Sequence, residues 1–157
     1  MIQMAIPSIS VEQLLDRAGL TLAGTVKWRT KVPESSSGIY VISIDCPEDV
    51  QLDGLPSEVR SRWNEGQQII YIGRSVNVGK RLSQFYRHVR GKPRPHRGGE
   101  DILRLEGQKL VHWSCVREYA LAERKLIEFF EQSVGKKPFG NRMRSAQLAK
   151  VSIGNSL

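Results

Sequence analysis

The chain has 157 residues, of which 39% are hydrophobic and 25% are charged, and its formal net charge is +8. This length suits one domain with a substantial core, and no stretch approaches the ~20 apolar residues of a membrane span. The first residues lack the pattern of a secretory signal, and two cysteines are too few for a disulfide scaffold or a cysteine-rich zinc site. We therefore expect a cytoplasmic protein without membrane contact.

The positive charge is concentrated in one segment. Residues 74–97 hold eight of the 24 Lys and Arg residues and no acid, so the rest of the chain, which has all 16 acids, is neutral. Such segregation favours a polyanionic partner such as nucleic acid. A solvated surface that happens to be basic is an equally simple interpretation of the charge alone.

The first expected elements are a helix and a strand. Ser10 followed by Gln13 is typical of a capping box and predicts a helix that ends at Gly19. Residues 20–29 are ambiguous and could form a strand. The β-branched run at 38–44 predicts a buried strand.

The middle of the chain predicts a strand and a basic helix. Residues 46–66 are polar and acidic, with a short helix expected after Pro56. Residues 69–72 predict the second strand. Residues 77–90 predict a helix with one apolar face, formed by Val78, Leu82, Phe85 and Val89.

The remaining elements follow in close succession. We expect an exposed basic loop at 91–99, a short helix at 100–105, a third strand at 109–116 and a helix at 118–133 that is stopped by Gly135. The order strand, strand, helix, strand, helix predicts an α+β fold with helices packed on a small sheet.

Five motifs occur in one order along the chain. Residues 38–40 read Gly-Ile-Tyr and residues 71–73 read Tyr-Ile-Gly, the two tripeptides that name the GIY-YIG nuclease family. Arg81 follows ten residues after Tyr71, as the family's catalytic arginine does. Residues 122–127 resemble the segment that carries the family's glutamate, and Pro138-Phe139-Gly140-Asn141 resembles its terminal Pro-x-x-Asn. The chain therefore resembles GIY-YIG nucleases over about two thirds of its length.

The resemblance implies an α+β fold whose small, three-stranded, mixed or antiparallel sheet is flanked by helices. It implies a nuclease domain at 38–143 with an insertion near 46–66, an N-terminal helix and extension at 1–37 that pack on the core, and a C-terminal tail at 144–157. The implied function is a metal-dependent endonuclease that hydrolyses phosphodiester bonds in DNA, double-stranded by preference, with one Mg²⁺ or Mn²⁺ per site. The alternative is a catalytically inactive nucleic-acid-binding module with the same fold.

By this resemblance the catalytic residues are Tyr40, Tyr71, Arg81, Glu123 and Asn141, with Glu123 as the metal ligand. Glu123 lies within the apolar arc of its helix, where a carboxylate needs a metal or an internal partner. Arg81 offers forked donors to a phosphate. Tyr40 would take a proton from the attacking water, although a cation would have to lower its pKa from about 10. Tyr71 would orient water or phosphate, and Asn141 would brace the site by hydrogen bonds.

Two further sets of residues complete the expected site. Gly38 and Gly73 are expected where backbone approaches closely. The expected nucleic-acid-binding residues are Arg74, Lys80, Arg87, His88, Arg90, Lys92, Arg94, His96 and Arg97. The two histidines of this set are expected on the surface. No zinc-finger spacing accompanies the domain, so target recognition is expected from the domain itself, a homodimer or a separate specificity partner.

Overall fold

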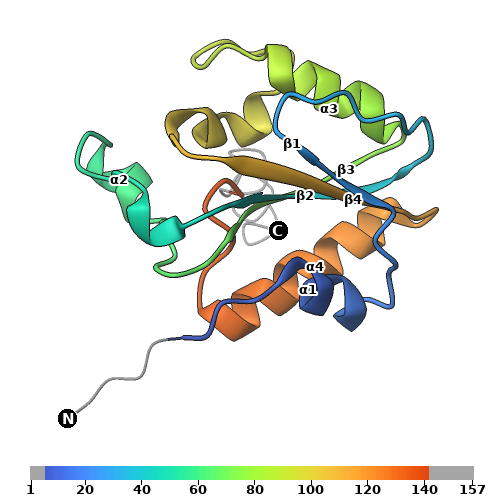
Figure 1. The fold of residues 1–157 in the computed structure, drawn as a ribbon, viewed down its shortest axis with the longest axis horizontal. Coiled ribbons are helices and arrows are strands. Elements are labelled where there is room, and N and C mark those ends of the chain that lie inside the picture. Colours follow the sequence, from blue (N-terminus) through green and yellow to red (C-terminus); the bar gives the residue numbers. More distant parts are fainter. Residues whose placement is uncertain (1–5, 142–157) are drawn as a thin grey trace, which may run out of the picture.

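A four-stranded antiparallel sheet forms the centre of the molecule (Figure 1). The computed structural model describes residues 6–141, apart from the side chains at 97 and 98. In spatial order the strands are β1 (Gly24–Lys27), β4 (Lys109–Cys115), β2 (Gly38–Ile44) and β3 (Ile69–Ser75). Every neighbouring pair is antiparallel. β2 is therefore an inner strand, and β3 is an edge.

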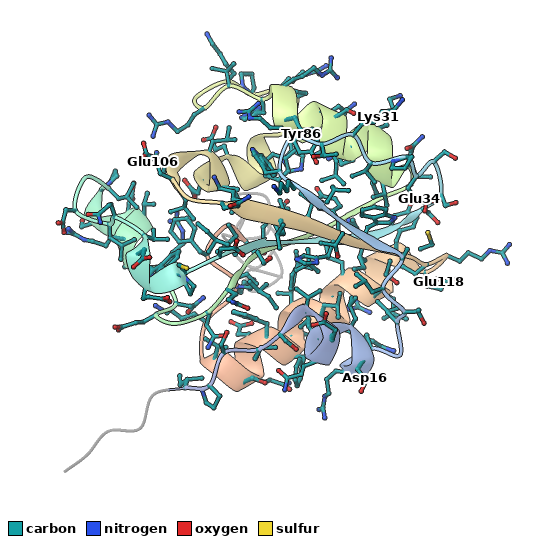
Figure 2. All side chains as sticks on the ribbon, in the orientation of Figure 1. Asp16, Lys31, Glu34, Tyr86, Glu106 and Glu118 are labelled. Atoms are coloured by element: carbon teal, nitrogen blue, oxygen red, sulfur yellow. The ribbon has the colours of Figure 1, made fainter. Side chains whose placement is uncertain are left out.

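Helices cover both faces of this sheet. α3 (Val78–Arg87) lies on one face, and α1 (Val11–Arg17) and α4 (Tyr119–Val134) lie together on the other (Figure 1). Side chains fill the layers in Figure 2, where Tyr86 lies on the α3 side and Asp16 on the α1 side. The α+β arrangement expected from the order of elements is confirmed.

Alternation along β2 produces two separate cores. Tyr40 and Ile42 join the core beneath α3, whereas Ile39 and Val41 join the core beneath α4. Successive side chains of a strand point to opposite faces, and an inner strand covered on both faces buries all of them. The buried strand predicted at 38–44 is confirmed.

The expectation of three strands is wrong, because β1 adds a fourth. Its side chains alternate between half-buried and exposed, so the segment carries no apolar run that would have predicted it. Gly24 lies opposite Trp113 of β4. A Cβ at Gly24 would lie 2.5 Å from the Trp113 ring, so glycine lets the two strands approach.

α1 forms as its capping signal predicts. The Ser10 side chain accepts a hydrogen bond from the Gln13 amide, and the Gln13 side chain accepts one from the Ser10 amide. The helix buries Leu14 and Leu15 in the same core as α4.

α3 begins where it was expected but ends three residues earlier. The Asn77 side chain caps the Lys80 amide, and His88 has an extended backbone that ends the helix after Arg87. Val89 consequently lies outside the helix and is 61% exposed. Its assignment to the apolar face is wrong, because the 3.6-residue spacing continues by chance beyond the helix end.

The remaining segments are short. The acidic insertion contains a 3₁₀ turn (Pro47–Asp49) and α2 (Ser57–Arg60), which is the short helix expected after Pro56. A kinked 3₁₀ helix, η2 (Arg97–Arg104), replaces the helix expected at 100–105. Within residues 6–141, no helix has the length and apolar character needed to cross a membrane. The tail expected at 144–157 lies outside the described residues.

Candidate active site

Tyr40 and Tyr71 lie on neighbouring strands at the edge of the sheet. Tyr40 is paired with Gly73 of β3, and Tyr71 is paired with Ile42 of β2. The two phenol rings are 6.0 Å apart between centroids. The Gly-Ile-Tyr and Tyr-Ile-Gly tripeptides are therefore two halves of one antiparallel pair, and the pairing brings the tyrosines together.

Glycine is required at both tripeptides because their backbones meet neighbouring atoms. A Cβ at Gly73 would lie 2.6 Å from the Tyr40 hydroxyl oxygen, and a Cβ at Gly38 would run into the Ser114 carbonyl. The close approach expected of these two glycines is confirmed. Gly73 thus provides the space in which the Tyr40 phenol lies.

The Tyr40 phenol is buried within this strand pair. The residue is 1% exposed, and burial is the main reason that its pKa is raised well above the ordinary value. Tyr71 and Glu123 raise this pKa further, while the positive charge of Arg81 opposes them. The sum favours a protonated, neutral Tyr40. A tyrosine that abstracts a proton needs a lowered pKa. The side chains around Tyr40 do not provide this decrease.

Arg81 extends from α3 toward the same region. Its Nη1 donates to the Pro95 carbonyl at 3.0 Å and to the Gln84 side chain at 3.1 Å. Its charge acts on Tyr40. The guanidinium is therefore held between α3 and the loop that precedes η2, with its position fixed by a carbonyl oxygen.

Glu123 approaches from the opposite layer of the molecule. It lies on α4, and its side chain is 16% exposed. Its charge also acts on Tyr40, which is on the α3 side of the sheet. β3 is an edge strand of the sheet. The charge of Glu123 can therefore act on Tyr40 around this edge, although the two residues belong to layers on opposite faces of the sheet.

Glu123 forms an ion pair with Arg74 at the end of β3. The Arg74 Nε and Glu123 Oε1 atoms are 3.7 Å apart, and the Arg74 side chain is 40% exposed. Both line an open groove of about 610 Å³ along α4. The buried position expected for Glu123 is only partly correct, since the carboxylate lies at the rim of a groove and is loosely paired.

Four glutamates line this groove, namely Glu118, Glu123, Glu128 and Glu131, and one carboxylate is enough to hold a hydrated divalent cation. Mg²⁺ is commonly held by one or two carboxylates and keeps several water ligands, and Glu123 presents one carboxylate to a volume that accommodates them. Arg74 competes for that carboxylate. Among the described residues, no cluster of three or more His, Cys, Asp or Glu side chains could hold a metal, so a cation here would depend on Glu123 and on substrate oxygens.

Asn141 completes the open edge of β3. Its Oδ1 accepts from the Ile72 amide at 2.9 Å, and its Nδ2 donates to the Ile72 carbonyl at 2.8 Å. The Gly140 amide donates to the Ile70 carbonyl two residues earlier. The side chain therefore pairs with the strand as a peptide group of a further strand would, and it braces the strand that carries Tyr71.

His88 and His96 are not surface residues, and the expectation that they face nucleic acid is wrong for this geometry. Both are buried. The His96 Nε2 atom lies 2.8 Å from the Tyr40 hydroxyl, and its ring stacks on Phe85. His88 accepts from the His96 amide and lies 3.2 Å from Glu100. Residues 91–94 of the expected exposed loop are on the surface, whereas His96 and Gly99 are buried.

No signal in the sequence would have found this role of His96. The loop that contains it is polar, rich in glycine and proline and without periodicity, all of which are typical of exposed segments. The buried His96 ring stacks on the Phe85 ring of α3, with ring centroids 3.9 Å apart.

The expected nucleic-acid-binding cations do lie on the surface. Those that the structure describes are all exposed: Arg74, Lys80, Arg87, Arg90, Lys92 and Arg94. The side chain of Arg97 lies outside the described part of the chain. In sequence, these residues run from the end of β3 through α3, which also carries Arg81, into the following loop.

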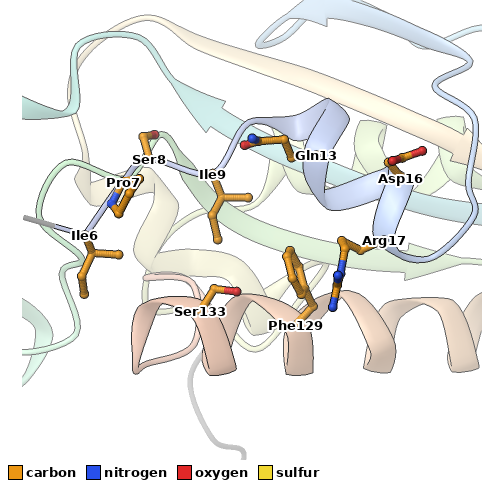
Figure 3. Close-up of a pocket in the computed structure, with 9 residues that line it drawn as sticks. All are labelled: Ile6, Pro7, Ser8, Ile9, Gln13, Asp16, Arg17, Phe129 and Ser133. Carbon is orange, nitrogen blue, oxygen red and sulfur yellow. The ribbon is translucent and has the colours of Figure 1, made fainter.

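A second groove lies away from Tyr40. It has a volume of about 390 Å³ and is formed by the segment before α1, by α1 itself and by α4 (Figure 3). Arg17 lies over the Phe129 ring at its wall, 4.6 Å from the centroid. Its lining is mixed and contains no group that joins the tyrosine site.

Comparisons of this chain with protein-family models, with curated proteins and with solved structures found no significant match. Function is therefore inferred from the motifs and from the geometry around Tyr40.

Proposed function

We propose that the protein is a metal-dependent endonuclease that hydrolyses phosphodiester bonds in DNA through a GIY-YIG site. The observation that carries the proposal is the pairing of the two tripeptides on β2 and β3, which places the Tyr40 and Tyr71 rings 6.0 Å apart between centroids. Tyr71 of β3, Arg81 of α3 and Glu123 of α4 all act electrostatically on Tyr40 of β2. These residues span positions 40–123 of the sequence, and the family resemblance assigns a role to each of them.

Arg81 is the group that binds the reacting phosphate in this proposal. A guanidinium stays charged and presents several donors to phosphate oxygens. The bond from Arg81 to the Pro95 carbonyl places its Nη1 against an oxygen, which is the kind of atom that a phosphate would offer. It would stabilise the charge that grows on the phosphate as water attacks.

Glu123 is the group that would hold Mg²⁺ or Mn²⁺. A bound cation supplies Lewis-acid stabilisation of the phosphate and of the leaving oxygen. Asn141 keeps β3 in register, and Tyr71 orients water or phosphate beside Tyr40. The exposed cations from Arg74 to Arg94 bind the DNA backbone, since most protein–DNA contacts go to phosphates.

Cleavage of supercoiled plasmid with Mg²⁺ or Mn²⁺ tests the proposal. We expect the parent protein to nick or linearise the plasmid. Arg81→Ala and Glu123→Ala should each lower the rate by about 100-fold or more, because loss of a charge-stabilising donor or of a metal ligand removes several kcal/mol from the transition state. DNA binding by Glu123→Ala, measured by fluorescence anisotropy, should be largely retained.

Glu128→Ala is the matched control, because Glu128 is exposed and lines the same groove on the same helix. It should cut as the parent does. Equal cutting by all four proteins would assign the activity to another site or to a contaminant.

A catalytically inactive nucleic-acid-binding module is the second candidate. One observation favours it: Tyr40, Arg81 and Glu123 each have a protein partner in His96, Pro95 and Arg74 respectively. A parent protein that binds plasmid with the expected salt dependence but leaves it intact with either metal would select this candidate.

A further inference from the structure

The contact between His96 and Tyr40 is not explained by the motifs. The His96 Nε2 and Tyr40 hydroxyl oxygen are 2.8 Å apart and buried. The imidazole stacks on Phe85, with centroids 3.9 Å apart and an angle of 21° between the planes. It also meets Tyr71 edge to face. Rings on two sides therefore restrict the imidazole to an orientation in which Nε2 faces the hydroxyl.

The backbone around His96 is fixed as firmly as its ring. The His96 amide donates to His88 Nδ1 at 2.9 Å, and the preceding Pro95 carbonyl accepts from Arg81. His88 in turn lies against Glu100. Among the described residues, the titratable or charged side chains around His96 include Tyr40 on β2, Tyr71 on β3, Arg81 on α3, His88 just after α3, and Glu100 through His88.

Tyr40 needs a neighbour that can take its proton. The residue is 1% exposed, so a proton that leaves its hydroxyl passes to an adjacent side chain and not to bulk water. Its hydrogen-bonding neighbours are Tyr71 and His96. A phenol, with an ordinary pKa of about 10, is far less suited to this near neutral pH than an imidazole, with an ordinary pKa of about 6.5.

We propose that His96 is a positioning residue of the nuclease site that accepts the Tyr40 hydroxyl proton at Nε2 during hydrolysis. This inference rests on the proposed function. The water oxygen bonds to phosphorus as its proton moves to the Tyr40 oxygen, and the original Tyr40 proton moves to His96. The bond from phosphorus to the leaving oxygen breaks with its electron pair on that oxygen, which takes a proton from solvent water. After the product leaves, Tyr40 passes the proton that it took to a water that enters the site, and His96, which is as buried as Tyr40, returns its proton to Tyr40.

The proposal fixes the resting tautomer of His96. To accept the Tyr40 hydroxyl hydrogen at Nε2, His96 must carry its own hydrogen on Nδ1. His88 accepts the His96 amide at Nδ1 and must carry its hydrogen on Nε2, directed at Glu100. The two neighbouring histidines are therefore opposite tautomers, which a spectroscopic measurement can distinguish without any catalysis.

The first test is ¹⁵N NMR of the full chain at pH 7 with labelled histidine. The sequence has three histidines, and His→Gln variants assign their signals. We expect His96 as the Nδ1–H tautomer and His88 as the Nε2–H tautomer, and Tyr40→Phe should shift the His96 Nε2 signal. A His96 ring that carries its hydrogen on Nε2 would overturn the proposal whether or not the protein cuts DNA.

The second test is single-turnover cleavage with Mg²⁺ by His96→Gln as a function of pH. Glutamine keeps polar atoms near Tyr40 but cannot take a proton near neutrality. We expect a rate about 100-fold or more below that of the parent, unchanged DNA affinity, and loss of the acid-side decrease that protonation of His96 causes in the parent.

His112→Gln is the control, since His112 is also buried but bonds Ser43 and Thr25 elsewhere on the sheet. It should keep the parent rate and pH profile. Parent-like cleavage and pH dependence in His96→Gln would make His96 purely structural. A parent that never cuts refutes the proposed function, and the tautomers then report separately on the Tyr40–His96 contact.

Discussion

At the scale of single residues, the site depends on two glycines, whose lack of a side chain leaves space for neighbouring atoms. Gly73 leaves the volume that the Tyr40 ring fills, and Gly38 lets β2 lie against the Ser114 carbonyl. Both needs could be inferred from the tripeptides. The burial of His96 could not be inferred, because it depends on a ring contact between Phe85, on an amphipathic helix, and His96, in a polar loop.

Gly73→Ala should disturb Tyr40 directly. The added methyl group would overlap the phenol ring, and overpacking of this kind costs about 1–3 kcal/mol of unfolding free energy. Chemical denaturation measures the loss. Gly54→Ala is the control, since nothing lies within 4 Å of a Cβ there, and it should be neutral. Equal stability of the two variants would mean that Tyr40 moves aside without cost, and its contact with His96 should then be lost as well.

At the scale of elements, the predictable segments were those marked by a local pattern, such as a regular spacing of hydrophobic residues or a capping signal. The strands at β2 and β3, the capped start of α1 and the long helix α4 all follow from local patterns. The fourth strand did not follow from a local pattern, because β1 is held mainly by pairing with β4. The end of α3 did not follow either, because the apolar spacing of its residues continues to Val89, which is exposed. Long-range pairing decides such segments, and no local pattern records it.

The loop between α3 and η2 is the element that joins the basic surface to the tyrosine site. Arg90, Lys92 and Arg94 are exposed on it, and it ends at His96 beside Tyr40. Glu100 holds its base, since the Glu100 Oε2 atom accepts from the Gly91 amide at 3.0 Å and lies 3.2 Å from His88. The Glu100 carboxylate thus holds the start of the loop, and His88 in turn accepts from the His96 amide at its end.

Glu100→Gln should loosen this loop while the rest of the fold stays intact. Hydrogen bonds to a charged group contribute about 1.5–3 kcal/mol, so amide exchange at Gly91 and His96 should become at least about tenfold faster. Hydrogen exchange by NMR measures this. Glu106→Gln is the control, because Glu106 is exposed beyond η2. Unchanged protection of both amides in Glu100→Gln would show that other contacts hold the loop.

At the scale of the whole molecule, charge is distributed in accordance with the proposed site. The entire net positive charge of the sequence lies in residues 74–97, and the fold places this segment along the end of β3, α3 and the following loop. The acidic insertion, with its 3₁₀ turn and α2, forms a separate projection of the molecule (Figure 1). The charge segregation favoured a polyanionic partner but agreed equally with a solvated basic surface, and the fold adds that the basic segment includes Arg81 and ends at His96 beside Tyr40.

The dependence of DNA affinity on salt tests this surface. Each phosphate contact contributes about 0.9 to the slope of log affinity against log salt, so Arg90→Ala with Lys92→Ala should reduce the slope by about 1.8. Anisotropy titrations of one duplex at several salt concentrations give the slope for each protein. Lys27→Ala with Arg60→Ala removes two exposed cations from β1 and α2 and matches the change in net charge. If both double variants lowered the slope equally, binding would follow net charge alone, and the loop would not be the part of the molecule that meets the DNA backbone.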